Sequence, residues 1–171
     1  MTKKDKTKDS LIIPYKKSYA PELLALLLEL HGSYLLDSAP PHISELREET
    51  NIQAAYKNYI SHIHKTKDDS LKIFLAADTN NKVTGFIIGS VSIDLDFVRG
   101  HVGKIEDWYV IKEHRGAGIG KKLYNDLEKW FKEKGCDQVV SDTWEGNELS
   151  INAHKQSGFF VSGISFSKKL K

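Results

Sequence analysis

Three closely spaced glycines, Gly116, Gly118 and Gly120, lie between a strand-like apolar run and an amphipathic helical pattern. The run covers residues 104–111, and the pattern after the glycines, residues 118–134, carries apolar side chains at helical spacing. Glycines let backbone N–H groups approach a ligand without a clash from a Cβ atom. The helix N-terminus adds the positive end of its dipole, so this turn predicts a site for a phosphate or pyrophosphate.

Two common phosphate-binding motifs do not fit the turn. A P-loop needs Ser or Thr directly after its Lys, but Lys121 is followed by Lys122, which leaves no hydroxyl for a magnesium ion. A dinucleotide fingerprint needs two residues between its last two glycines, and only Ile119 lies between Gly118 and Gly120. The remaining alternative is a purely structural turn, which the flanking Arg and Lys side chains argue against.

The rest of the chain reads as one mixed fold. We expect strands over residues 11–15, 72–78, 83–93, 104–111 and 137–141, with short closing strands over 159–161 and 164–167. We expect helices over residues 22–30, 44–64, 118–134 and 147–156, the first ended by Gly32 and the second capped by Ser44. Antiparallel pairs followed by a parallel crossover predict the α+β (α/β) class with a mixed central sheet.

Composition bounds the function more weakly. The net charge of +2 comes from four Lys and two Asp in the first ten residues, so the body of the chain is neutral. We therefore expect residues 1–10 to be a disordered tail, residues 11–171 to form a single domain, and nucleic acid not to be a partner. No apolar run is long enough for a membrane span, and the single cysteine, Cys136, fits a reducing, cytoplasmic location and a small buried side chain.

The pattern Arg115-x-x-Gly118-x-Gly120 resembles the acetyl-CoA pyrophosphate signature of the GNAT (Gcn5-related N-acetyltransferase) superfamily. The segment from Ser141 to Phe159 is similar, more narrowly, to aminoglycoside 6'-N-acetyltransferases. The resemblance implies an acetyl-CoA-dependent N-acetyltransferase domain. It also implies a mostly antiparallel sheet with one splayed parallel pair and about four flanking helices.

The resemblance also assigns the cofactor contacts. It implies that backbone groups of Trp108, Tyr109 and Val110 bind the pantetheine arm and that Asn147 contacts the same arm. Asn147 is equally suited to capping the following helix. The pyrophosphate would be held by the turn itself, which comprises Arg115, Gly116, Ala117, Gly118, Ile119, Gly120 and Lys121.

Acid and base candidates follow from the same resemblance. A carboxylate must free the attacking amine of its proton, and Glu106 occupies a base position used by several members. We expect Asp107 to point to the opposite face because side chains alternate along a strand, which favours Glu106. His154 stands where the family usually has the Tyr that protonates the departing thiolate, and it is otherwise a packed helix residue.

We expect the acceptor to be a small cationic amine, of the polyamine or aminoglycoside class. Members of the family bind acceptors between the N-terminal helices and the strands beside the splay, where this chain carries Asp37, Glu45, Asp94, Asp96, Asp142 and Glu145. The alternatives are a protein N-terminal or lysine acetyltransferase, a non-catalytic acyl-CoA-binding module, and plain solvated charges at these positions. We expect no metal, and we leave open a homodimer.

Overall fold

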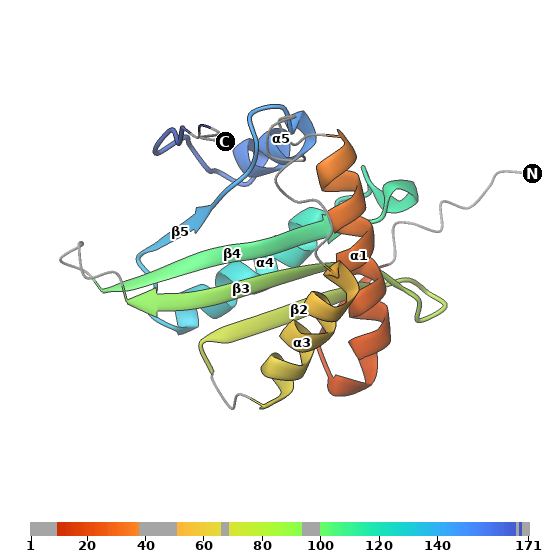
Figure 1. Cartoon of the computed structure of the whole chain (residues 1–171). Helices are drawn as coiled ribbons and strands as arrows, with labels where there is room; N and C mark the ends of the chain where they lie inside the picture. Colours follow the sequence, from red (N-terminus) through yellow and green to blue (C-terminus); the bar gives the residue numbers. More distant parts are fainter. Residues whose placement is uncertain (1–9, 38–50, 66–68, 94–99, 167, 169–171) are drawn as a thin grey trace, which may run out of the picture.

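The computed structural model describes residues 10–37, 51–65, 69–93, 100–166 and 168. Its centre is a five-stranded sheet in the order β1-β2-β3-β4-β5 (Figure 1). Every neighbouring pair is antiparallel except β4 and β5, which are parallel. The strands are β1 Leu11–Pro14, β2 Leu71–Ala77, β3 Val83–Ile93, β4 His101–Val110 and β5 Gln138–Ser141. This arrangement confirms the predicted fold class.

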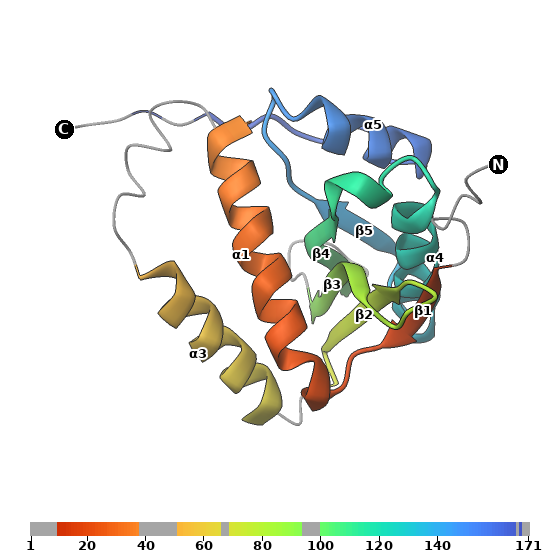
Figure 2. The same ribbon diagram turned by 90° about the vertical axis from the view of Figure 1, so that its right-hand side faces the viewer.

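Helices cover both faces of the sheet. Helices α1 and α3 lie on one face and α4 on the other, while α5 lies at the end of the sheet where β4 finishes (Figure 2). The bounds are α1 Ala20–Asp37, α3 Ile52–Lys65, α4 Ile119–Glu133 and α5 Glu148–Gln156, with short 3-10 turns η1 Lys17–Tyr19 and η2 Lys112–His114.

Alternation along β3 produces one core on each face. Phe86 and Ile88 are fully buried in the cluster under α1, whereas Ile87 is fully buried in the cluster under α4. Because successive strand side chains point to opposite faces, an unbroken apolar run of this kind needs helices on both sides.

One prediction about the end of an element was wrong. Helix α1 continues through Gly32 to Asp37, because Gly32 does not adopt the left-handed conformation of a stop signal. Packing against α3, where the rings of His31 and Tyr56 meet at 6.0 Å, supports the extra turns. Of the second predicted helix, the described part is α3, and Ser44 lies outside the described residues.

The predicted closing strands are also absent from the described residues. Residues 159–166 follow α5 without strand pairing, although their apolar residues suggested a strand pattern. The side chains responsible are exposed instead: Phe160 by 84%, Val161 by 77%, Ile164 by 78% and Phe166 by 93%. An apolar strand pattern forms a strand only where a neighbouring edge accepts its hydrogen bonds, and no described edge does so here.

Glycines allow α4 to lie close to the sheet. A Cβ atom added to Gly103 of β4 would come within 2.6 Å of the Phe131 ring, and one on Gly89 of β3 would come within 2.6 Å of Leu127. Both α4 side chains are buried. Direct contact between helix and sheet therefore depends on the missing side chains at these two positions.

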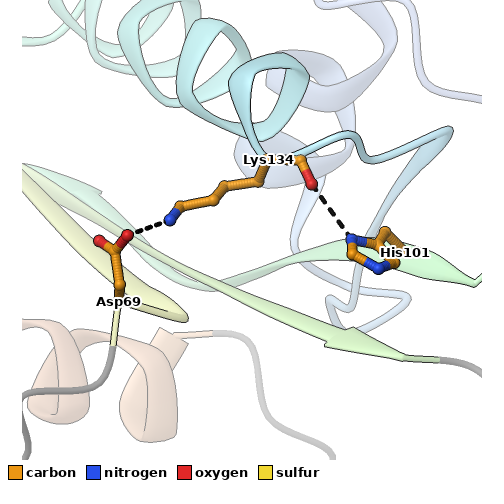
Figure 3. A network of polar contacts seen from close by, with 3 residues as sticks. All are labelled: Asp69, His101 and Lys134. Carbon is orange, nitrogen blue, oxygen red and sulfur yellow. Dashed lines mark hydrogen bonds and ion pairs between the residues drawn. The ribbon is translucent and has the colours of Figure 1, made fainter.

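The C-terminal end of α4 is fixed to two strand starts. His101 donates from Nδ1 to the carbonyl oxygen of Lys134 at 3.1 Å, and the Lys134 ammonium pairs with Asp69 (Figure 3). Asp69 is 85% exposed, so this ion pair contributes little, and the bond to the helix carbonyl is the better-defined contact. These contacts hold α4 at the end far from its glycine turn.

Replacing Gly103 by Ala is expected to lower the free energy of unfolding by about 1–3 kcal/mol, because the added methyl group must displace the Phe131 ring. Chemical denaturation measures the change. The control is Gly32→Ala, where a Cβ atom meets nothing within 4 Å inside a helix. That variant should gain roughly 0.5–1 kcal/mol. Equal stability of the two variants would show that α4 does not depend on the close approach.

Candidate active site

β4 and β5 diverge halfway along β4. Their parallel ladder ends at the pair Ile105 and Ser141, and β5 stops there while β4 continues to Val110. We call the edge of residues 106–110 that β5 leaves uncovered the β4 opening. This is the splayed parallel pair that the family resemblance implied, and on that side no described strand pairs with the backbone groups of β4.

Hydrogen bonding to β3 determines which groups face the β4 opening. Ile111 donates its N–H to Thr84 at 3.0 Å, and antiparallel neighbours exchange such bonds at alternate residues. Tyr109 therefore bonds toward β3, whereas Trp108 and Val110 turn their N–H and C=O groups to the opening. The Val110 carbonyl already accepts a bond from Arg115 Nε at 2.8 Å.

Tyr109 is thus the exception among the three residues expected to bind the arm through their backbones. Its ring is buried on the α1 face, its hydroxyl donates to Glu29 at 2.9 Å, and the Arg115 guanidinium lies 5.4 Å from its centre. Tyr109 positions Arg115 at the end of β4, and its own backbone groups are directed away from the opening.

The glycine turn, residues 115–121, exposes backbone that no side chain covers at Gly116 and Gly118. Gly116 and Gly118 have φ values of 80° and 78°, which favour glycine, and an added Cβ atom would meet nothing within 4 Å at either. Gly118 is the N-cap of α4 and has no side chain to bond the helix amides. The first helical bond runs from Lys122 N–H to the Gly118 carbonyl at 3.0 Å, so the N–H groups before it have no acceptor within the helix.

The side chains around the turn differ in their exposure. Ile119 is buried and Ala117 packs against the same core, so they present only backbone to the turn. Lys121 is exposed beside the turn, whereas the Lys122 ammonium lies 3.4 Å from the Ser10 carbonyl, to which it donates. A Cβ atom on Gly120 would lie 3.4 Å from the Trp108 indole nitrogen, so glycine here lets the helix start close to the β4 opening.

A β-bulge corrects the expectation that Asp107 faces away from Glu106. Ile88 of β3 pairs with Asp107 and the next residue, Gly89, pairs with Ile105, which leaves Glu106 as the extra residue. Beyond the bulge, Trp108 packs in the α4 cluster and Tyr109 in the α1 cluster, so Asp107 shares the α1 and α3 face. The bulge interrupts the alternation on which the choice of Glu106 rested.

The two carboxylates have different surroundings. Glu106 is exposed, accepts a hydrogen bond from the Ser90 hydroxyl at 2.5 Å, and pairs with the Lys104 ammonium at 3.2 Å. Asp107 is half-buried, and burial, followed by the neighbouring charge of Glu106, raises its pKa to about 7. Lys104 opposes this shift. A carboxyl group that titrates near neutral pH is suited to accept a proton there.

Tyr59 of α3 interacts electrostatically with this pair and was missed by the sequence analysis. Burial raises the pKa of its hydroxyl, and the charges of Asp107 and Glu106 raise it further. Glu29 of α1 was missed as well, although it lies against Tyr109 on the same face of the sheet. Neither residue belongs to a motif, and only the packing of α1 and α3 against β4 brings them here.

His154 is held by contacts on every side. Its Nδ1 lies 2.7 Å from the Ser150 carbonyl oxygen and 3.3 Å from the Ser150 hydroxyl, and its Nε2 lies 2.8 Å from the Ser141 hydroxyl. Its ring makes T-shaped contacts with Trp108 and Phe159 at centroid distances of 5.5 and 5.2 Å. His154 is therefore packed against a residue of the β4 opening and hydrogen-bonded to the last residue of β5.

Asn147 caps α5, since its side-chain oxygen accepts the Ser150 N–H at 3.1 Å. This bears out the capping interpretation and leaves its amide NH₂ as a donor. Asp142 and Glu145 are exposed in the loop after β5. Asp37 is the last residue of α1, and its side chain, together with Glu45, Asp94 and Asp96, lies outside the described residues.

Other chemistries find little support in the described residues. No group of three His, Cys, Asp or Glu side chains there could hold a metal, and His64 is engaged with the Tyr15 hydroxyl at 2.8 Å. Burial raises the pKa of the Cys136 thiol, which disfavours its thiolate. None of the described helices combines the length and apolar character that crossing a bilayer requires.

Known proteins resemble this chain in sequence. It is 31% identical over 91 residues to an aminoglycoside N(6')-acetyltransferase type 1 from Stenotrophomonas maltophilia, covering 51% of this chain and 58% of that protein. It is 41% identical over 80 residues to a glucosamine 6-phosphate N-acetyltransferase from Trypanosoma brucei brucei, covering 44% and 52%. The chain thus matches little more than half the length of either curated relative.

Comparison with a solved structure and with a family model leads to the same kind of protein. The aminoglycoside N-acetyltransferase AAC(6')-Iy, solved in complex with CoA, superposes with a TM-score of 0.73 at 22% identity, covering 95% of this chain and 96% of that one. The model of the Acetyltransferase (GNAT) family matches residues 32–159, which include the β4 opening, the glycine turn and α5. With the fold, the splay and the turn in the expected order, this chain belongs to the GNAT acetyltransferase family.

Proposed function

We propose that the protein is an N-acetyltransferase that moves the acetyl group of acetyl-CoA to a primary amine by direct attack in a ternary complex. The observation that carries the proposal is the β4 opening beside an uncapped glycine turn. Such a pair offers strand-type hydrogen bonds to an extended amide-bearing arm and amide donors to the pyrophosphate at its end. Pantetheine carries both kinds of group.

The proposed cofactor contacts follow from the same geometry. Amides from Arg115 to Gly120 bind the pyrophosphate, with the Arg115 and Lys121 side chains adding positive charge. Trp108 and Val110 bind the pantetheine amides through the backbone groups that they turn to the opening. A backbone N–H that faces the opening can also polarise the thioester carbonyl, and a donor of this kind is typically worth about 2.7–4 kcal/mol of activation free energy. The Asn147 amide NH₂ donates to the arm.

The base in this proposal is the pair of carboxylates at the β-bulge. An alkyl ammonium group must lose a proton before its nitrogen can attack the thioester. Glu106, which pairs with Lys104 and accepts the Ser90 hydroxyl, supplies negative charge that attracts the ammonium. Asp107, with its pKa near neutrality, takes the proton directly or through a water molecule. His154 supplies the proton for the departing thiolate.

The acceptor is proposed to be a small cationic amine. Three carboxylates, Glu29, Glu106 and Asp107, line the α1 and α3 face of β4, and negative charge there favours a polycation over a neutral amine. The similarity to an aminoglycoside N(6')-acetyltransferase points in the same direction. The proposed contributions of Asp37, Glu45, Asp94, Asp96 and Asp142 extend this charge.

An amine screen tests the proposal. Calorimetry with acetyl-CoA comes first, and release of free thiol is then followed with spermidine, an aminoglycoside, glucosamine 6-phosphate, a neutral amine and a lysine peptide. We expect turnover with the first two, at a rate that falls steeply with added salt because screening at 0.15 M limits charge effects to about 8 Å. Turnover of the peptide alone would identify a protein acetyltransferase. Binding of acetyl-CoA without any thiol release would identify a non-catalytic module.

A further inference from the structure

Ser141 contacts His154 and belongs to the strand pair at which the β4 opening begins. The Ser141 hydroxyl ends β5 and lies 2.8 Å from His154 Nε2. We infer that Ser141 is the group that protonates the departing CoA thiolate, and that His154 supplies the proton through it. This inference rests on the proposed acetyltransferase function and changes the donor that the sequence suggested for it.

The hydrogen bonds of the imidazole fix where its protons are. The Ser150 carbonyl oxygen, 2.7 Å from Nδ1, can only accept, so Nδ1 carries a hydrogen whether the ring is neutral or charged. Protons therefore enter and leave His154 at Nε2, and Nε2 faces Ser141. When the ring is neutral, the Ser141 hydroxyl donates to Nε2. When the ring is charged, Nε2 donates to Ser141, whose own hydrogen becomes available to another acceptor.

The position of Ser141 puts it at the inner end of the β4 opening. It forms the last pair of the parallel ladder with Ile105, and beyond that pair β4 continues without β5. Five residues of strand, 106–110, span about 17 Å from this pair to the end of β4, and the short turn η2 leads from there to the glycine turn. An arm anchored by its pyrophosphate at that turn and extended along the opening brings its thioester end toward Ser141.

The contacts of His154 also place His154 and Ser141 beside the β4 opening. The imidazole makes a T-shaped contact with the Trp108 ring, and the Trp108 backbone faces the opening. Phe159 closes on the ring from the other side at 5.2 Å. The ring is therefore held in one orientation, with Nε2 directed at Ser141, and direct donation from Nε2 to a thiolate would require that bond to break.

The amine nitrogen bonds to the thioester carbon, the C–S bond breaks, and its electron pair stays on sulfur. Ser141 gives its hydroxyl proton to that sulfur and receives the Nε2 proton of charged His154, which leaves the ring neutral with hydrogen on Nδ1. The proton of the amine passes through the β-bulge carboxylates to solvent, and His154 regains one from solvent.

The experiment is a double-mutant cycle on kcat with acetyl-CoA and the best acceptor of the screen. Ser141→Ala and His154→Phe should each lower kcat by about 10²-fold, which is the low end of the contribution of a positioned proton donor. The double variant should be no slower than the slower single variant, because residues that act as one chain lose their effect once. Affinity for acetyl-CoA should stay at the wild-type value throughout.

Two control variants separate proton transfer from packing. Ser150→Ala removes a hydroxyl 3.3 Å from the same imidazole but keeps the carbonyl acceptor, and should retain wild-type kcat. Ser141→Thr keeps a hydroxyl and should retain most activity. A wild-type kcat in Ser141→Ala, or single effects that multiply in the double variant, would overturn the role of Ser141. Wild-type protein that binds acetyl-CoA but acetylates no amine would instead overturn the proposed function, and with it the step that Ser141 serves.

Discussion

Asp107→Asn is expected to lower kcat/KM for a cationic amine by about 10²–10⁴-fold at pH 7, the usual contribution of a general base. The physical reason is that the half-buried carboxyl group at the β-bulge has its pKa raised to about 7, so near neutral pH it can hold the proton that the amine releases. The loss should shrink as pH rises, because the amine then deprotonates without help. Steady-state rates between pH 6 and pH 10 measure both effects.

Glu106→Gln is the matched comparison one residue away. It removes the like charge beside Asp107, which lowers the Asp107 pKa, so the acid side of the kcat/KM profile should move to lower pH. It also removes charge that attracts the ammonium, so KM should rise more than kcat falls. A profile that keeps its ionisation near pH 7 in Asp107→Asn and loses it in Glu106→Gln would make Glu106 the base.

The same raised pKa predicts how Asp107 affects stability. An Asp has a pKa of about 3.9 in an unfolded chain, so between that value and about 7 the folded state binds more protons at this site. The contribution of Asp107 to the free energy of unfolding therefore falls as pH rises through this window. Asp107→Asn should be at least as stable as wild type at pH 8. A loss of activity at that pH then reflects chemistry and not unfolding.

Gly118→Glu is expected to abolish acetyl-CoA binding. The added carboxylate would project into the open space at the start of α4, where the proposed pyrophosphate meets the helix amides. Placing like charges together costs several kcal/mol, so the dissociation constant should rise by about a hundredfold or more. Isothermal titration calorimetry measures the affinity, and circular dichroism checks that the variant is folded.

Gly135→Glu provides a control on the same helix. Gly135 follows the C-terminal end of α4, has a φ of 73° against 78° for Gly118, and also has open space around its Cβ position. Each variant therefore forces an L residue into the left-handed conformation, at a cost of about 1–2 kcal/mol, and each adds one negative charge. Gly135→Glu should bind acetyl-CoA like wild type. Equal losses in both variants would attribute the effect to destabilisation and remove the pyrophosphate from the turn.

Several structural features of this protein follow from short stretches of its sequence. The turn from Gly116 to Gly120 requires residues without a Cβ atom, and the apolar spacing after it allows only a helix with one buried face. Asn147 caps α5, as Asn before a helical pattern predicts. These features depend on a few neighbouring residues, so the strand, turn and helix at the centre of the site could be predicted.

Only the tertiary structure decided the features that depend on distant partners. The bulge at Glu106 arises from the register between β3 and β4, and no period-2 pattern can show that one strand has gained a residue. Helix α1 runs past Gly32 because α3 packs against it, and residues 159–166 form no strand because no described edge accepts them. Tyr59 and Ser141 became candidates only when folding brought α3 to Asp107 and α5 to the end of β5, since contact energies between distant segments are not written in local spacing.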